Sequence, residues 1–145
     1  FMPRLPYRDY LASISAVDLA LDPFPYNGGT TSMETLVMGV PLVTLAGDHS
    51  VARGGVSLLS NLGLAELIAA TPQDYVEIVR RLIDNPARLA ALRGSLRERV
   101  QASPLMDGAR FTRNLEALYR SMWRAWCKTQ GVGENGEGSG LLPVA

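Results

Sequence analysis

The sequence predicts an α/β fold in which a parallel sheet is flanked by helices. Two apolar runs, residues 17–21 and 41–45, have the character of buried strands. The continuous apolar character of the second run favours a parallel strand that is buried on both faces. A segment of helical period lies between them, and two strands joined by a helix imply a crossover connection and parallel pairing. The chain has 145 residues, which is long enough for one domain with a substantial core.

The other elements follow from apolar periodicity and from residues that begin or end helices. Gly39 and Gly63 favour left-handed helix ends, and Thr71 is an N-cap candidate directly before a proline. We predict strands over residues 17–21, 41–45 and 67–69, and helices over 7–16, 31–38, 52–61, 72–83, 86–100 and 109–129. The glycine-rich sequence that follows has no core pattern. We therefore expect one domain over residues 1–129 and a disordered tail over 130–145.

Two of the predicted helices carry more arginines or aromatic residues than a simple amphipathic pattern needs. Helix 86–100 has arginines at positions 88, 93, 97 and 99, which form either a basic patch or, as we prefer, a solvated face balanced by Glu98. Helix 109–129 combines an apolar stripe with Tyr119 and Trp123, a wider apolar surface than one sheet face usually covers. We expect some of these aromatic side chains to be exposed in the isolated chain.

Composition argues against several classes of protein. Lys+Arg and Asp+Glu both number 14, which gives no support for a nucleic-acid or anionic-membrane binder. No apolar run approaches the roughly 20 residues of a membrane span, and residues 1–4 lack the order of a signal peptide. The single cysteine fits a reducing compartment, so we expect a cytoplasmic protein. The single histidine, His49, is expected in an exposed loop and rules out a histidine-based metal cluster.

The turn over residues 22–31 is the strongest candidate for a binding site. The first turn of a helix leaves N–H groups unpaired at its positive end. Gly28 and Gly29 let a phosphate approach the backbone, and the hydroxyls of Thr30 and Thr31 can add hydrogen bonds. Glu34 lies about one helical turn further on, where it can accept bonds from sugar hydroxyls. A nucleotide diphosphate fits this arrangement, but glycine-rich turns also serve only to reverse the chain, and both interpretations remain open.

The run DPFPYNGGTTSMETLVMGVPLVTLAG resembles the nucleotide-binding segment of the O-linked N-acetylglucosamine transferase family, GT41, and its bacterial relatives. The likeness continues through residues 58–69, 103–105 and 119–123, and covers nearly all of residues 1–126. It implies a Rossmann-like parallel sheet flanked by helices, forming the C-terminal, donor-binding half of a two-domain GT-B glycosyltransferase. The start at Phe1, without an initiator Met, leads us to expect a fragment of a longer chain.

The resemblance also implies roles for individual residues of the turn. The acidic position matching Glu34 takes the ribose hydroxyls, and aspartate also occurs there in the family. Many relatives carry a histidine where Gly29 stands, so a polarised donor is missing here and the tightness of diphosphate binding is in question. The residues that would hold the donor's diphosphate are Asn27, Gly28, Gly29, Thr30 and Thr31.

Further binding residues are implied outside this turn. The segment from Leu5 to Tyr10 resembles the family's base-binding loop, in which the backbone around Leu5 pairs with the base and the ring of Tyr10 offers a face to a pyrimidine. By periodicity alone Tyr10 fits a core position better than a stacking role, and the family has other residue types at Tyr7 and Tyr10. Arg53 follows the second strand and either meets a phosphate or pairs with Asp48.

The chemistry that the resemblance implies is inverting transfer of N-acetylglucosamine or another hexose from a UDP-sugar to a protein hydroxyl. Helix N–H groups would stabilise the leaving diphosphate, and we expect no cofactor or metal ion, in line with the absence of an Asp-x-Asp motif. We expect the catalytic residues, the acceptor-binding half and tandem helical repeats to lie upstream, so that this chain alone binds donor without turnover. The alternative is a non-catalytic remnant that binds nucleotide or docks a partner.

Overall fold

The computed structural model describes residues 3–130 and divides the chain into two units, Phe1–Met106 and Asp107–Ala145. The first unit holds a small sheet with helices packed against it, and the described part of the second unit is helix α6 (Gly108–Thr129). The single domain that we expect over residues 1–129 stays a prediction. Apart from Gln130, the predicted tail lies outside the described residues.

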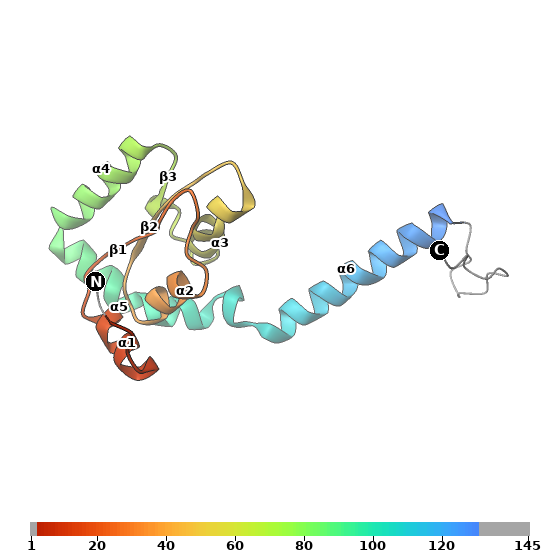
Figure 1. Ribbon diagram of the computed structural model, residues 1–145, viewed down its shortest axis with the longest axis horizontal. Helices are drawn as coiled ribbons and strands as arrows, with labels where there is room; N and C mark the ends of the chain where they lie inside the picture. The colour runs from red at the N-terminus through yellow and green to blue at the C-terminus, as the bar shows by residue number, and fades with distance from the viewer. Residues whose placement is uncertain (1–2, 131–145) are drawn as a thin grey trace. The chain divides into compact units, whose positions relative to one another are not determined.

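The sheet is parallel and has the strand order β1-β2-β3, with Ala20 opposite Leu42 and Thr44 opposite Ile68. Helices α3 (Gly54–Asn61) and α4 (Pro72–Ile83) both pack on β2 and β3, and in Figure 1 they lie on opposite sides of these strands. The predicted fold class, a Rossmann-like parallel sheet flanked by helices, is confirmed. The strands are β1 (Ala20–Leu21), β2 (Leu42–Leu45) and β3 (Ile68–Ala69).

Strand β1 is shorter and more exposed than predicted. The apolar run over residues 17–21 predicts a buried strand, but Val17 is 46% exposed and Leu21 is 57% exposed. In the described sheet β1 lies at the edge, with β2 on one side and no strand on the other. The prediction is wrong for these side chains because an apolar run does not reveal whether its strand becomes a central or an edge strand.

The helices of the first unit begin and end close to their predicted limits, because local signals determine those limits. Gly39 and Gly63 have positive φ angles of 77° and 66°, as predicted for helix ends. Thr71 and Asp74 form a reciprocal capping box at the start of α4. None of the helices found among residues 3–130 combines the length and hydrophobicity needed to cross a membrane. The helices of this unit are α1 (Tyr7–Ser15), α2 (Thr30–Val37), α3 (Gly54–Asn61), α4 (Pro72–Ile83) and α5 (Pro86–Ala102).

One hydrophobic core joins the central strand to four of these helices. Each element contributes side chains that are almost completely buried. Examples are Leu36 from α2, Val43 from β2, Leu59 from α3, Leu82 from α4 and Leu96 from α5. Removing these large side chains from water supplies the main driving force for folding, and it holds the carboxyl ends of the strands in place.

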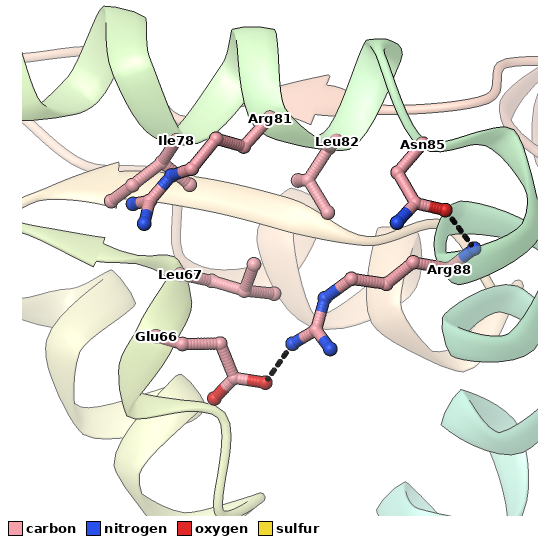
Figure 2. A pocket seen from close by; sticks show the side chains of 7 residues that line it. All are labelled: Glu66, Leu67, Ile78, Arg81, Leu82, Asn85 and Arg88. Atoms are coloured by element: carbon pink, nitrogen blue, oxygen red, sulfur yellow. Dashed lines mark hydrogen bonds and ion pairs between the residues drawn. The ribbon is translucent and has the colours of Figure 1, made fainter.

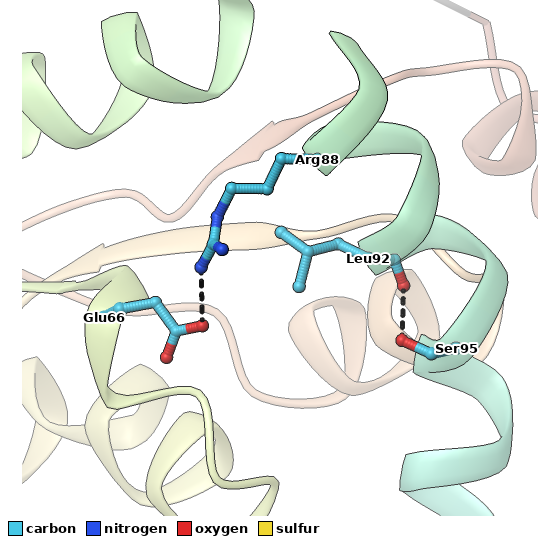
Figure 3. Close-up of polar contacts among 4 residues, drawn as sticks. All are labelled: Glu66, Arg88, Leu92 and Ser95. Carbon is cyan, nitrogen blue, oxygen red and sulfur yellow. Dashed lines mark hydrogen bonds and ion pairs between the residues drawn. The ribbon is translucent and has the colours of Figure 1, made fainter. Parts of the chain in front are cut away.

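Two arginines of α5 have specific partners. Arg88 forms an ion pair with Glu66 at 3.1 Å, as Figure 3 shows, and Arg93 donates hydrogen bonds to the backbone carbonyls of Ser15 and Val17. Arg88 is exposed, as expected of a solvated face, and Arg93 is half-buried, but neither of these contacts is with Glu98. Their partners lie 22 or more positions away in the sequence, which a prediction made helix by helix does not detect.

Helix α6 begins at an N-cap, Asp107, whose carboxylate accepts a hydrogen bond from the backbone N–H of Arg110. Several of its large apolar side chains are exposed, as expected from the width of the apolar surface. The rings of Trp123 and Trp126 stack with their centroids 5.1 Å apart. The exposed apolar side chains of α6 are Phe111, Leu118, Tyr119, Met122, Trp123 and Trp126.

Candidate functional site

The predicted turn lies at the carboxyl ends of β1 and β2, the edge at which parallel α/β sheets bind ligands. Its first residue, Asp22, donates its backbone N–H to the carbonyl of Val43, so pairing with β2 continues to the start of the turn. Its far side is tied to the loop after β2, because the N–H of Asn27 bonds to the carbonyl of Val51 at 3.0 Å. The turn is therefore held from both strands.

The Asp22 carboxylate organises the turn from beneath and is only 1% exposed. One oxygen accepts hydrogen bonds from the backbone N–H of Gly28 at 2.9 Å and from the hydroxyl of Ser32 at 3.0 Å. The other oxygen accepts the hydroxyl of Thr44 at 2.7 Å. These donors compensate the cost of burying a charge, and they join β1, β2 and the first turn of α2 at one point.

Tyr75 on α4 adds an anchor to this arrangement. Its hydroxyl donates to the backbone carbonyl of Asp22 at 3.1 Å, and its ring meets Phe24 edge-on with 5.8 Å between centroids. Burial, followed by the negative charge of Asp22, raises the pKa of Tyr75. The sequence alone did not indicate a site role for Asp22 or Tyr75. The available signal was an acidic residue directly after an apolar strand, where a charge needs partners.

Asn27 is buried and its side chain is engaged within the protein. The amide nitrogen donates to the carbonyl of Pro23 at 2.9 Å, and the amide oxygen accepts the N–H of Gly55, in the first turn of α3, at 3.4 Å. Asn27 therefore shapes the turn and ties it to the N-terminus of α3. Since α2 begins at the other end of the turn, the N-termini of two helices meet around it.

The outer surface of the turn is open. Thr30 and Thr31 are exposed, and neither hydroxyl forms a hydrogen bond within the described part of the chain. The two glycines differ in their surroundings: a Cβ on Gly28 would lie 2.2 Å from the Ser32 hydroxyl oxygen, whereas one on Gly29 would meet no atom within 4 Å. Packing thus requires glycine at position 28 only, and position 29 faces free space.

Glu34 lies on α2 beside a cavity of about 470 Å³ that is also lined by Gly29 and Thr30. Its two carboxylate oxygens accept hydrogen bonds from Tyr7 at 3.0 Å and Tyr10 at 3.1 Å. The hydrogen bond to Glu34 and the charge of that carboxylate raise the pKa of Tyr7. Burial, followed by its own hydrogen bond to Glu34, raises the pKa of Tyr10. The structure therefore brings one predicted base-binding residue into contact with the predicted ribose-binding residue.

The remaining predicted residues lie at the margins of this region. Leu5 is half-buried in the segment that precedes α1. Arg53 is exposed at the N-cap of α3, and its guanidinium donates to the carbonyl of Gly47 at 3.0 Å. The described residues contain no ion pair between Arg53 and Asp48, so that alternative is not realised, and the contact with phosphate stays a prediction. His49 is exposed, as expected.

A second cavity, of about 330 Å³, lies where β3 begins and α4 ends. Figure 2 shows Arg88 reaching across it to Glu66, while the side chain of Asn85 caps the backbone N–H of Arg88. These polar groups already bind one another. None of the predicted site residues lines this cavity.

Comparison with known proteins identifies the class to which this fold and turn belong. The model of the family described as Glycosyl transferase family 41 matches residues 8–115, and the chain belongs to this family. The suspected resemblance is thereby confirmed.

Individual relatives agree with this assignment. The chain is 49% identical over 120 residues to the probable UDP-N-acetylglucosamine–peptide N-acetylglucosaminyltransferase SPINDLY of Solanum lycopersicum. It is 35% identical over 109 residues to the UDP-N-acetylglucosamine–peptide N-acetylglucosaminyltransferase of Caenorhabditis elegans. These matches cover 83% and 75% of this chain but only 13% and 10% of the relatives.

A solved structure extends the agreement to the fold. A mutant of the Thermobaculum terrenum O-GlcNAc transferase superimposes with a TM-score of 0.82 at 42% identity, over 89% of this chain and 25% of that one. This supports the expected fold class, that of a GT-B glycosyltransferase.

Proposed function

We propose that this chain is the donor-binding part of an inverting, metal-independent glycosyltransferase. The enzyme would transfer N-acetylglucosamine or another hexose from a UDP-sugar to a protein hydroxyl. The observation that carries this proposal is the open turn between β1 and α2 beside the Glu34 cavity, with two threonine hydroxyls that have no hydrogen-bond partner among residues 3–130. The names of the relatives support the same donor and a peptide acceptor.

The diphosphate would sit on the outer side of this turn. The first hydrogen bond within α2 runs from the N–H of Met33 to the carbonyl of Gly29, so the preceding N–H groups are available to a ligand. The N–H of Gly28 is already bound to Asp22. We therefore assign phosphate binding to the N–H groups of Gly29, Thr30 and Thr31 and to the two threonine hydroxyls. Asn27 and Gly28 shape the turn, and Arg53 approaches from α3.

Catalysis would come from donors that are in place before the reaction begins. As the bond between sugar and phosphate breaks, negative charge develops on the leaving diphosphate. The positive ends of α2 and α3 and the N–H groups of α2 oppose that charge. This arrangement supplies electrostatic stabilisation from the protein itself, which is why we propose that a metal ion is not required.

The rest of the nucleotide would extend along α1. Glu34 accepts hydrogen bonds from the ribose, Tyr10 offers its ring to the base, and the backbone around Leu5 pairs with the base edge. The chain spans 13% of the length of the first plant relative, so we place the acceptor site and the remaining catalytic groups in other parts of a longer, cytoplasmic protein. Those parts would include the other GT-B half and tandem helical repeats.

Isothermal titration of the chain with uridine and guanosine diphosphates, with and without a chelator, tests this proposal. Replacing Thr30 and Thr31 together by valine keeps their size and deletes the hydroxyls. We expect the variant to lose about 1–3 kcal/mol of diphosphate affinity. Thr112→Val on α6 is the matched control and should bind like the unmodified chain. Unchanged affinity in the double variant would contradict the assignment, and a loss of binding on chelation would contradict metal independence.

A second candidate function is a non-catalytic module that binds nucleotide or docks a partner. The observation that favours it is Gly29, because many relatives are expected to carry a histidine there. The two candidate functions differ because only a glycosyltransferase transfers sugar to an acceptor. Incubating the full-length protein with a UDP-sugar and an acceptor peptide decides between them, because a glycosylated peptide would exclude the non-catalytic alternative.

A further inference from the structure

We propose that Tyr7 and Tyr10 are positioning residues that orient the Glu34 carboxylate toward the ribose of the bound nucleotide. This inference rests on the proposed function, because it requires Glu34 to accept the ribose hydroxyls. It adds a role for Tyr7, which is not among the predicted site residues, and it gives Tyr10 a second task beside the base.

The geometry joins three side chains from two helices. Tyr7 and Tyr10 are one helical turn apart on α1, so their side chains project from the same face. Their rings lie 6.3 Å apart between centroids, and each hydroxyl reaches a different oxygen of Glu34 on α2. With one hydrogen bond on each oxygen, both the position and the rotation of the carboxylate group are determined.

The anchored Glu34 carboxylate can still accept hydrogen bonds from a ligand. An ionised carboxylate has about four lone-pair sites, and the tyrosines occupy one on each oxygen. One site on each oxygen remains, which matches the two adjacent hydroxyls of a ribose. Glu34 and Tyr7 both line the cavity that also contains Gly29 and Thr30, so this capacity lies next to the proposed diphosphate site.

Preorganisation gives this arrangement its effect on binding. A glutamate on a half-exposed helix face loses rotamer freedom when a ligand immobilises it. In this chain the tyrosine hydroxyls already hold the side chain before nucleotide arrives, so less freedom is lost on binding. Deleting either hydroxyl should therefore weaken ribose recognition even though neither tyrosine needs to touch the ribose.

A purely structural role for the tyrosines makes a different prediction. Helix α1 has no fully buried residue, so the same two bonds also help to hold it on α2. If docking of α1 were their only purpose, their loss would alter stability without altering the preference for ribose over deoxyribose. Discrimination between the two sugars is thus the informative measurement.

The test is titration calorimetry with UDP and 2′-deoxy-UDP on the 145-residue chain and its Tyr7→Phe, Tyr10→Phe and Glu34→Ala variants. Tyr7→Phe keeps the ring and removes one anchor. We expect it to weaken UDP binding roughly threefold to tenfold, with a smaller effect on the deoxy analogue, so that the preference for ribose narrows. In the Glu34→Ala background the same change should have no further effect. Tyr119→Phe, an exposed tyrosine on α6, is the matched control.

The outcomes separate this inference from the proposed function. If Glu34→Ala narrows the ribose preference and Tyr7→Phe does not, the positioning role is wrong while the ribose role of Glu34 stands. If neither variant changes the preference for ribose, both the positioning role of the tyrosines and the ribose role of Glu34 are wrong. Tighter UDP binding by Tyr7→Phe would show that the tyrosine competes with the ribose, which also overturns the inference.

Alkaline titration of tyrosine absorbance gives a second readout that needs no ligand. The hydrogen bond to Glu34 raises the pKa of Tyr7, and burial followed by the hydrogen bond to Glu34 raises the pKa of Tyr10. Glu34→Ala removes the contribution of the carboxylate, so tyrosine ionisation should begin at a lower pH than in the unmodified chain. Identical titration curves would mean that the two hydroxyls do not contact Glu34 in solution, and the inference would fail.

Discussion

At the scale of single residues, Asp22 shows how a buried charge can shape the candidate turn without facing the surface proposed for the ligand. Its carboxylate faces inward, where Gly28, Ser32 and Thr44 supply its hydrogen bonds. A free negative charge on the outer surface of the turn would repel a diphosphate. Buried beneath the turn and satisfied by donors, the same charge instead holds the first turn of α2 in position.

Removing this carboxylate should destabilise the chain more than removing any one of its partners. Asp22→Ala leaves three donors without an acceptor, and at about 1 kcal/mol for each we expect a loss of about 3 kcal/mol in the free energy of unfolding. Thr44→Val, which deletes one of these bonds at nearly constant size, should cost about 1 kcal/mol. Urea denaturation measures both values. Equal losses for the two variants would show that Asp22 does not hold the turn.

At the scale of elements, the turn and helix α2 act as one unit in which adjacent glycines have different tasks. A methyl group on Gly28 would displace the Ser32 hydroxyl from Asp22, whereas a side chain on Gly29 projects into open space. The first glycine is required for packing. The second leaves room at the proposed diphosphate site, where a larger residue would contact the ligand.

These glycines should therefore respond differently to the same substitution. We expect Gly28→Ala to lower the free energy of unfolding by about 1–3 kcal/mol through overpacking, and Gly29→Ala to change it by less than about 0.5 kcal/mol. Gly29→His, which restores the side chain expected in many relatives, should tighten diphosphate binding. Thermal unfolding measures the stability of the two alanine variants, and titration calorimetry measures the diphosphate affinity of Gly29→His. Equal stability of the two alanine variants, or weaker binding by Gly29→His, would contradict this account.

At the scale of the whole molecule, we expect the exposed aromatic side chains of α6 to govern how the isolated chain behaves in solution. Trp123 is 59% exposed and Trp126 is 45% exposed, and the two rings are stacked. Met122 and Tyr119 add further exposed apolar surface on the same helix. A contiguous patch of this kind favours association.

We therefore expect both tryptophans to be accessible to a neutral quencher and the sedimentation coefficient to rise with protein concentration. Trp123→Gln and Trp126→Gln together should reduce the self-association without unfolding α6, because both side chains are exposed. Trp123→Phe is the conservative comparison. A chain that stays monomeric at high concentration, with both tryptophans shielded, would contradict this prediction.

Features that depend on neighbouring residues can be predicted from the amino-acid sequence alone. Thr71 and Asp74 mark the start of α4, and Gly39 and Gly63 mark helix ends, because capping and positive φ angles are local properties. The glycine turn and the family were recognised from one continuous segment, which carries both the motif and its spacing. The parallel sheet followed from the order of apolar and amphipathic segments.

Contacts between residues from distant segments depend instead on how the whole chain folds. Tyr10 and Glu34 are 24 positions apart, and Asp22 and Thr44 are 22 apart, so neither contact is visible in any periodic pattern. The exposure of Leu21 and the partners of Arg93 likewise depend on strand order and on how α5 packs against the start of the chain. The physical reason is the same in each case: hydrogen bonding and burial depend on distances in space, and these arise only when the whole core has formed.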